Sequence, residues 1–271
     1  MTDLIKKLGK GTAETQGKGL KKTASLKRWE IAQDSEKEYW QGYTSESLKK
    51  ESGERYPRKA RILIKEWQKF IKINKNTRIL QVGCGPEDVI NHFEIGKLSS
   101  ADPLADFYKK RFDFNYKKSG LVKGSGESIP FPDKYFDVVI LINVLDHVHL
   151  PEKVLKELKR VMKDDGIFHF EDYTYQKNFI RIAKLYGSIK KAFTGEIFNI
   201  HHPYMFTAQD LRTLIRKEFK IVHEEIGRDI GCYESFEEMK RNKRKDKKLT
   251  TKLPALFGLY GIINYSCICK K

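Results

Sequence analysis

Two glycines and an aspartate in the first half of the chain have the spacing of a nucleotide-type binding site. The apolar run Ile79–Val82 ends in Gly83-Cys84-Gly85. Glycines at the tip of a first parallel strand let the backbone turn sharply and approach a ligand closely. Asp102 follows Gly83 by nineteen residues, where a carboxylate can accept both hydroxyls of a ribose. An ordinary turn aspartate before Pro103 is the alternative, but together the two features favour an adenosine-containing cofactor.

The residues after the glycine turn narrow the choice of cofactor. A pyrophosphate-binding loop usually has a third glycine, in the pattern G-x-G-x-x-G, but here the glycines stop at Gly85. Glu87 and Asp88 follow instead, and two carboxylates would repel a pyrophosphate. They are compatible with the cation-bearing methionine end of S-adenosylmethionine (SAM). NAD is therefore disfavoured.

Three stretches of the chain carry a resemblance to a known family. They are Leu80–Gly85, the segment Gly124–Val139 with its run Ile129-Pro130-Phe131-Pro132-Asp133, and the segment Asn143–Val148 with the following Leu155–Gly166. Over about residues 75–172 the chain resembles the class I SAM-dependent methyltransferases, especially the broad subgroup that includes small-molecule and lipid methyltransferases. Asn264–Lys271 is similar to the final antiparallel strand of that family. The resemblance therefore implies SAM as the cofactor.

The resemblance also implies a set of cofactor contacts. They run from the first strand to the end of the fourth: Gln81, Gly83, Cys84, Gly85, Asp102, Pro103, Leu104, Gly126, Glu127, Asn143 and Val144. In this set Asp102 would hold the ribose, and Cys84 would fill space within the turn. Two positions depart from the family pattern. Gln81 stands where an acidic residue is common, so one cofactor hydrogen bond would lack charge assistance. Ser125 stands where an aspartate often contacts the adenine.

Polar residues after the fourth and fifth expected strands are candidates for work on the methyl acceptor. Methyl transfer from a sulfonium is an in-line displacement, so alignment matters most, and a base is needed only when the acceptor starts protonated. His147 is the candidate base, with Asp146 beside it to orient it. A loop histidine packed on the next helix, with an aspartate that caps, is the alternative. Glu171, past the fifth strand, points to the same edge and could touch the acceptor.

A second group of acceptor candidates precedes an expected helix at Thr207. His201, His202 and Tyr204 lie in a region that often covers the substrate pocket in the family, so the resemblance implies an acceptor contact there. A turn shaped by these residues is the alternative. The aromatic and basic stretch 178–198 could form a lid helix within a lid-like region at 174–206, or it could pack on the sheet.

Short β-branched runs alternate with amphipathic helices over most of the chain. The runs are Arg78–Val82, Lys97–Ala101, Leu121–Lys123, Phe136–Ile142, Ile167–Phe170, Lys220–Ile226 and Ile262–Cys269. The clearest helices are Pro151–Lys163 and the one that begins at Thr207, where Thr207-Ala-Gln-Asp210 is a capping-box variant. This alternation predicts an α/β fold, a Rossmann-like and mostly parallel sheet with helices on both faces. The family resemblance adds seven strands, the last antiparallel.

The formal net charge of +17 is unevenly distributed along the 271 residues. Residues 1–60 carry a net +5, residues 61–239 only +3, and residues 240–271 carry +9. We therefore expect a mobile basic tail at 1–24, an N-terminal helical extension at 25–74 and a SAM-binding domain at 75–271, which is nearly neutral up to residue 239. Helices at Ser25–Tyr43 and Pro57–Ile73 would form the extension.

A basic loop is expected at 239–252, because seven of the nine residues at 240–248 are Lys or Arg. Such a segment would attract RNA or the anionic surface of a membrane. A solvated loop without a partner is the alternative.

Several classes of protein are disfavoured by composition. No uncharged apolar run approaches the ~20 residues of a membrane-spanning helix, and the N-terminus lacks the apolar core of a secretory signal. The four cysteines have no C-x-x-C spacing, so neither a disulfide scaffold nor a structural zinc is expected, and no metal site is predicted. We expect a cytoplasmic protein, with docking at the periphery of a membrane as a variant.

The sequence thus predicts a SAM-dependent methyltransferase that acts on a small-molecule, lipid-linked or glycan-type acceptor. Two alternatives stay open. One is an RNA or protein methyltransferase docked by its basic flanks, and the other is a non-catalytic SAM-binding or scaffold protein, suggested by Gln81 and Ser125. The oligomeric state and the choice among O-, N- and C-transfer are not determined by the sequence.

Overall fold

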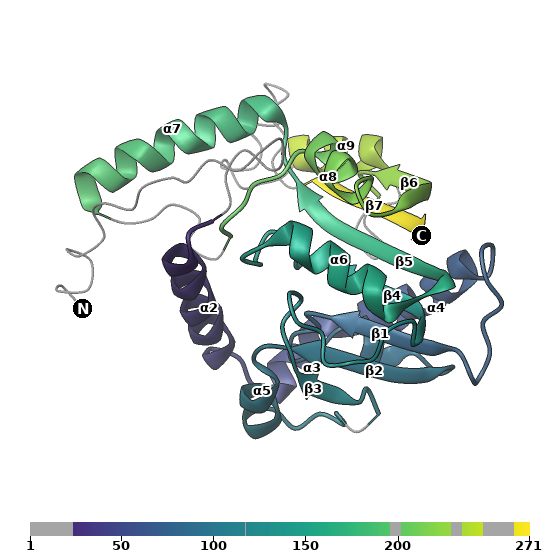
Figure 1. The fold of residues 1–271 in the computed structure, drawn as a ribbon. Helices are drawn as coiled ribbons and strands as arrows, with labels where there is room; N and C mark the ends of the chain where they lie inside the picture. Colours follow the sequence, from purple (N-terminus) through teal and green to yellow (C-terminus); the bar gives the residue numbers. More distant parts are fainter. Residues whose placement is uncertain (1–23, 117, 196–201, 229–234, 246–262) are drawn as a thin grey trace.

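One seven-stranded sheet forms the centre of the protein (Figure 1). The computed structural model describes residues 24–116, 118–195, 202–228, 235–245 and 263–271. The strands are β1 (Arg78–Val82), β2 (Lys97–Asp102), β3 (Leu121–Lys123), β4 (Phe136–Ile142), β5 (Met162–Thr174), β6 (Lys220–Ile226) and β7 (Ile263–Lys270). Their order is β3-β2-β1-β4-β5-β7-β6, and β7 runs antiparallel to both neighbours. The predicted Rossmann-like sheet with an antiparallel last strand is confirmed.

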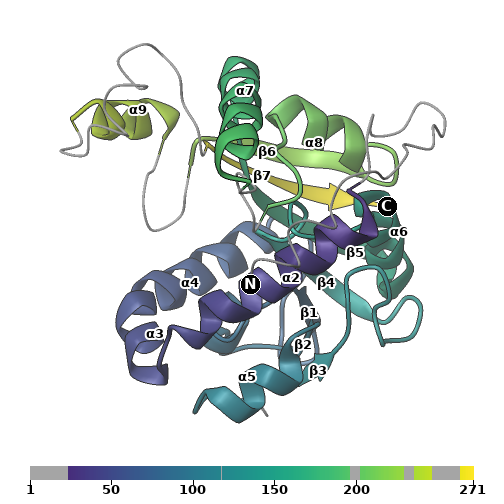
Figure 2. The ribbon, with the colours of Figure 1, turned by 90° about the vertical axis from the view of Figure 1, so that its left-hand side faces the viewer.

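Helices cover both faces of the sheet (Figures 1 and 2). They are α2 (Leu26–Gln41), α3 (Ser45–Ser52), α4 (Arg55–Trp67), the 3-10 helix η1 (Val89–His92), α5 (Ala105–Arg111), α6 (Pro151–Val161), α7 (Lys177–Thr194), α8 (Ala208–Ile215) and α9 (Phe236–Lys245). Apolar side chains of α6 and α8 join one core, and those of α4, α5 and η1 join the other. Strand β4 serves both cores, because successive side chains of a strand point to opposite faces. Within the described ranges, no helix has the length and apolarity to cross a membrane.

Local sequence signals account for two of these helices. At the start of α8, Thr207 Oγ1 accepts from the backbone N–H of Asp210 at 3.1 Å, and the Asp210 carboxylate accepts from the N–H of Thr207 at 2.9 Å. The expected capping box is therefore present. Helix α6 begins with Pro151, and its buried stripe includes Val154, Leu155 and Leu158.

Some expected boundaries were wrong. The basic stretch predicted as a loop over 239–252 is helical up to Lys245, as part of α9, and residues 246–252 lie outside the described residues. Glu237 and Glu238 in the first turn and a basic last turn suit the helix dipole, and Met239 is buried. The expected tail at 1–24, apart from Ala24, and His201 also lie outside the described residues.

The N-terminal extension crosses the sheet at the carboxyl ends of its parallel strands. Figure 2 shows α2 running diagonally over this edge. Its C-terminal end is held by Arg111 of α5, which donates to the carbonyls of Gln41 and Tyr43 at 3.1 and 2.9 Å. Just before α2, the N–H of Ala24 donates to the Tyr204 hydroxyl at 2.8 Å. Helix α2 is thus anchored at both ends.

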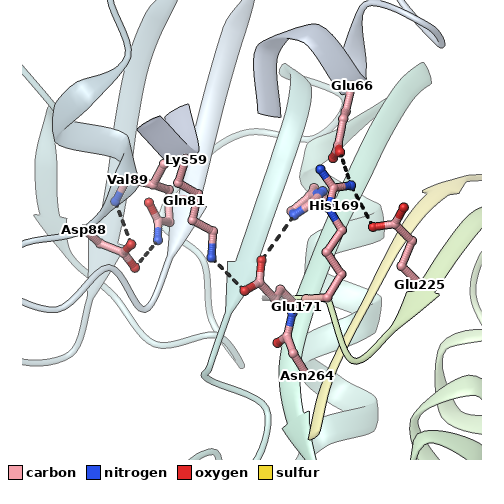
Figure 3. A network of polar contacts seen from close by, with 10 residues as sticks. Lys59, Glu66, Gln81, Asp88, Val89, His169, Glu171, Glu225 and Asn264 are labelled. Carbon is pink, nitrogen blue, oxygen red and sulfur yellow. Dashed lines mark hydrogen bonds and ion pairs between the residues drawn. The ribbon is translucent and has the colours of Figure 1, made fainter. Parts of the chain in front are cut away.

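A buried ion pair fixes α4 to the sheet. Lys59 Nζ lies 2.7 Å from a carboxylate oxygen of Glu171 on β5, and both side chains are 3% exposed (Figure 3). The other Glu171 oxygen faces His169 Nε2 at 3.9 Å. Burial by itself raises the pKa of Glu171, but Lys59 and His169 lower it to about 2. Near the end of α4, Glu66 pairs with Arg228 at 2.7 Å.

Replacing Lys59 tests how much this pair stabilises the fold. In Lys59→Met the Glu171 carboxylate stays buried without its cation, so we expect the free energy of unfolding to fall by about 3–5 kcal/mol in urea denaturation at neutral pH. The double variant Lys59→Met/Glu171→Gln is the control and should recover most of that loss.

The pH dependence of the folding stability provides a second test of the Lys59–Glu171 pair. The folded-state pKa of Glu171, about 2, lies below its ordinary value of 4.5, so the pair stabilises the fold fully above that ordinary value. Its contribution is lost as the pH falls toward 2. The difference in stability between wild type and Lys59→Met should shrink over that range, and equal stability of the two proteins at neutral pH would contradict a stabilising pair.

Candidate functional site

A cavity of about 480 Å³ lies at the carboxyl ends of β1, β2 and β4. The loops after these strands form its floor, and residues of α2 and α4 form the wall that faces them. The strand order reverses between β1 and β4, which is where open α/β sheets bind ligands. Most of the sequence-predicted cofactor residues therefore meet in one place, beneath the N-terminal extension.

The glycine turn after β1 is shaped by the residues opposite. Gly83 and Gly85 have φ of +68° and +57°, in the left-handed region that glycine adopts at little cost. A Cβ on Gly83 would lie 2.4 Å from a methyl of Val144, so only glycine fits against the loop after β4. At Gly85 a Cβ would lie 3.7 Å from Trp40, an ordinary contact. The turn thus brings backbone to the cavity with no side chain in the way.

Asp102 lies at the end of β2 with its carboxylate at the cavity. One oxygen accepts from the N–H of Gly85 at 3.0 Å and the other from the N–H of Leu104 at 2.8 Å. Burial raises the pKa of Asp102 to about 7, although these two hydrogen bonds lower it. Each oxygen keeps a second acceptor site, so the carboxylate could accept two hydroxyl groups at once.

The other predicted cofactor residues divide into two groups. Those that line the cavity are Gly83, Cys84, Gly85, Asp102, Pro103, Leu104, Gly126, Glu127, Asn143 and Val144. Gln81 is not among the lining residues, because its side-chain amide donates to Asp88 at 2.6 Å and accepts from the N–H of Ile90 at 3.1 Å. Glu127 lines the cavity, but one of its oxygens accepts from the N–H groups of His149 and Leu150 ahead of α6.

His147 and His202 line another part of the cavity wall, and they form a cluster with Asp146, which is not itself a lining residue. Asp146 is 3% exposed, and one oxygen lies 2.6 Å from His202 Nδ1, a hydrogen-bond distance. Its other oxygen lies 3.5 Å from His147 Nε2, and the two imidazole centroids are 4.4 Å apart. The sequence paired Asp146 with His147, but the shorter contact is to His202.

The charge of Asp146 acts on His202. Burial by itself lowers the pKa of His202, but the hydrogen bond and the negative charge of Asp146 raise it above its ordinary value. Glu36 of α2 adds to this effect, and its carboxylate lies 3.9 Å from His147 Nδ1. The arrangement can orient an imidazole and stabilise its protonated form, which is what a general base requires.

Within the part of the chain that the structure describes, these same three residues lie close enough together to hold a metal ion. One ligand atom from each lies within 4.8 Å of the others, and two imidazoles with one carboxylate form a common ligand set. However, His202 Nδ1 lies 2.6 Å from the Asp146 carboxylate, which is the distance of a charge-assisted hydrogen bond. The two atoms are therefore arranged to bond to each other through a proton, and this arrangement does not favour a metal between them.

Two further residues predicted to touch the acceptor do not line the cavity. Glu171 pairs with Lys59, as described above. The Tyr204 hydroxyl donates to the carbonyl of His149 at 2.7 Å and accepts from Ala24, so it holds the start of α2. His201 lies outside the described residues.

The part of the cavity wall that comes from the N-terminal helices α2 and α4 was not predicted from the sequence. Its members are Trp29, Gln33, Glu36, Tyr39 and Trp40 of α2, and Arg55, Tyr56 and Lys59 of α4. The aromatic residues of the first expected helix were a signal that it is not a simple surface helix. Nothing in the sequence indicated which part of the sheet it covers.

Several buried polar atoms around the cavity lack a partner. Trp40 Nε1, Asn143 Oδ1, Asp146 Oδ1 and His147 Nδ1 are buried and have no hydrogen-bond partner among the described residues. Buried polar groups are nearly always hydrogen-bonded in folded proteins. Unsatisfied atoms on opposite sides of one cavity suggest that a polar ligand completes it.

Part of the chain is similar in sequence to known methyltransferases. Residues 80–170 match the model of a methyltransferase domain. Over 107 residues the chain is 33% identical to a sterol 24-C-methyltransferase of Candida albicans, a match that covers 36% of this chain and 28% of that protein. Over 151 residues it is 31% identical to the demethylmenaquinone methyltransferase of Anoxybacillus flavithermus, covering 49% of this chain and 61% of that protein. The chain therefore spans less than two thirds of each of these relatives.

The fold is also shared with a solved structure. A provisionally named sarcosine dimethylglycine methyltransferase from Galdieria sulphuraria has a TM-score of 0.54 and 16% sequence identity, over 79% of this chain and 86% of that one. At this level of identity the likeness concerns the fold alone.

Substitutions in the glycine turn test its packing. Gly83→Ala and Gly85→Ala introduce a similar positive-φ strain, but only the first drives a methyl into Val144. We expect Gly83→Ala to lower the free energy of unfolding by about 1–3 kcal/mol more than Gly85→Ala does, measured by urea denaturation. Adding Val144→Ala to Gly83→Ala should recover much of that difference. If Gly83→Ala and Gly85→Ala are equally stable, Val144 does not constrain the turn.

Proposed function

The chain carries a methyltransferase domain of the class I, SAM-dependent kind, and from this premise we propose that it transfers the methyl group of SAM to a hydroxyl of a small or lipid-type acceptor. The observation that carries the proposal is that the glycine turn, Asp102 and His202 line one cavity. Gly83, Gly85 and Asp102 form the cofactor side, and His202 forms the acceptor side, with its Nδ1 held at 2.6 Å by Asp146, which is not itself a lining residue.

The residues present fit SAM. The turn at Gly83 and Gly85 leaves room for the methionine half, and Asp102 offers two carboxylate oxygens to the ribose hydroxyls. Asn143 Oδ1, a buried acceptor without a partner among the described residues, suits an ammonium group. Leu104 and Gly126 would lie against the adenine. When bound, SAM supplies a methyl group activated by its sulfonium.

The proton of the acceptor would go to His202. Asp146 holds the imidazole at 2.6 Å and raises its pKa, so His202 is both oriented and more basic than an ordinary histidine. When SAM is bound, the acceptor oxygen would bond to the methyl carbon as the carbon–sulfur bond breaks, and the electron pair of that bond would stay on the sulfur of the leaving thioether. The hydroxyl proton would go to His202, and the Asp146 carboxylate would stabilise the imidazolium that results. His147, at the longer distance of 3.5 Å from Asp146, would pack against the acceptor rather than receive its proton.

The proposed acceptor is apolar apart from the hydroxyl. Trp29 and Tyr173 line the cavity together with His202, and they give it an aromatic surface. The relatives named for sterol and demethylmenaquinone act on lipid-type molecules by those names, which supports the same class here. An RNA or protein acceptor, and SAM binding without catalysis, are the competing functions, and the following assay distinguishes all three.

A transfer assay tests both the acceptor class and the base. Methyl-labelled SAM is incubated with lipid, small-molecule, RNA and protein fractions of host extract, and we expect label in the lipid or small-molecule fraction. In this assay His202→Ala should lower the rate by about a hundredfold or more, the range of a lost general base. His147→Ala should lower it less than about tenfold, because no base function is lost.

Two control measurements distinguish a general base at His202 from a metal ligand or a residue that only binds the acceptor. Asp146→Asn removes the charge that raises the pKa of His202, so the acidic limb of the pH–rate profile should move to lower pH. A chelator should leave the rate unchanged, since the proposed mechanism uses no metal. Label in RNA or protein, label in no fraction, a larger effect of His147→Ala than of His202→Ala, or loss of activity on chelation would each contradict the proposal.

A further inference from the structure

Helix α7 presents an apolar stripe to the outside of the protein. The exposed fractions of Ile182, Leu185, Tyr186, Ile189 and Phe193 are 53%, 64%, 53%, 48% and 87%. Their spacing of i, i+3, i+4, i+7 and i+11 places them on one face of a helix. Five of the nine large hydrophobic side chains that are exposed among the described residues thus lie on this one helix, which makes the stripe a surface feature rather than scatter.

The opposite face of α7 contacts the body of the protein only at a few points. Ile180 and Ala183 are the buried residues of the helix, at 8% and 7% exposure, and both precede Gly187. Figures 1 and 2 show the rest of the helix standing away from the sheet. The stripe therefore does not face the core that α6 and α8 complete.

The charges on α7 have a single sign. Its sequence contains Lys177, Arg181, Lys184, Lys190 and Lys191 and no Asp or Glu. At about 100° per residue, Arg181 and Lys190 fall on the two sides of the apolar stripe. Long basic side chains at the borders of an apolar face can reach the level of lipid headgroups while their stems stay on apolar surface.

We propose that α7 docks this protein on an anionic lipid bilayer, lying in the plane of the interface with the stripe of Ile182, Leu185, Tyr186, Ile189 and Phe193 buried among the headgroups. An interfacial helix combines an apolar face with Lys and Arg at its borders, and anionic lipid attracts such a helix. A second copy of the same helix is a poorer partner, because two helices that each carry five cations and no acid would repel.

The docking helix joins the wall of the cavity directly. Tyr173 lines the cavity, and α7 begins four residues later at Lys177. A lipid-type acceptor held in the bilayer would thus be presented next to the site. Docking by α7 does not depend on the proposed methyl transfer. If the vesicle experiment fails, the proposed methyl transfer is unaffected, and if the transfer assay fails, the proposed docking is unaffected.

Co-sedimentation of the full chain with vesicles tests the proposal. The probes are phosphatidylcholine vesicles with and without roughly one third phosphatidylglycerol. We expect binding to the anionic vesicles, weakened by added salt. Leu185→Gln/Phe193→Gln should lower the partition coefficient about a hundredfold, because burial of each of these two side chains is worth about a tenfold step.

A matched pair of exposed apolar residues outside α7 provides the control. Leu26 and Val222 are 55% and 37% exposed, so Leu26→Gln/Val222→Gln also replaces two exposed apolar side chains by glutamine, elsewhere on the surface. It should leave the partition coefficient within about twofold of wild type, because these side chains lie outside the stripe. Thermal melting of both double variants establishes that they fold.

Three results would overturn the proposal. The first is no binding of the wild type to anionic vesicles. The second is undiminished binding of Leu185→Gln/Phe193→Gln, which would assign docking to another surface such as the basic segment 240–248. The third is self-association of the wild type in sedimentation velocity that the α7 variant abolishes, without any vesicle binding, which would make the stripe a contact between two copies.

Discussion

The buried ion pair between Lys59 and Glu171 determines where the N-terminal helices stand. A lysine and a glutamate at 3% exposure are costly to bury, and their mutual contact at 2.7 Å, with His169 near the other Glu171 oxygen, compensates for the loss of water. Helix α4 is therefore held to β5 at one register, with Arg55 and Tyr56 at the cavity. Helix α2 belongs to the same N-terminal extension and is held at its C-terminal end by Arg111. Its position therefore depends on the Lys59–Glu171 pair as well as on Arg111.

The site consequently has three origins in the chain. The region that matches the methyltransferase domain, residues 80–170, supplies the glycine turn, Asp102 and Asp146. The opposite wall comes from α2 and α4, and His202 comes from the segment after α7. A cavity assembled from three parts of the chain can keep its cofactor side while its acceptor side varies with the surrounding helices. This division fits a protein whose likeness to its relatives is confined to part of their length.

Features encoded in a few neighbouring residues were predictable from the sequence. The strand that ends just before Gly83, the capping box of Thr207 and Asp210 and the apolar stripe of α6 each depend on local spacing, and each is present. Long-range partners were not predictable. Glu171 was expected at the acceptor because it follows a strand, but its side chain points to the α4 side, where Lys59 meets it. The choice of His202 over His147 as the partner of Asp146 depends on a loop that returns from 56 residues away.

If this cavity binds SAM, Asp102 holds the ribose. Calorimetric titration of the protein with SAM at two pH values measures that binding and the part that Asp102 has in it. Because burial raises the pKa of Asp102 to about 7 and the ionised form accepts both hydroxyls, the account predicts one-to-one binding that is about tenfold weaker at about pH 6 than at about pH 8. Asp102→Asn should bind weakly at both. Absence of SAM binding, or an affinity that is the same at both pH values in the wild type, would contradict the account.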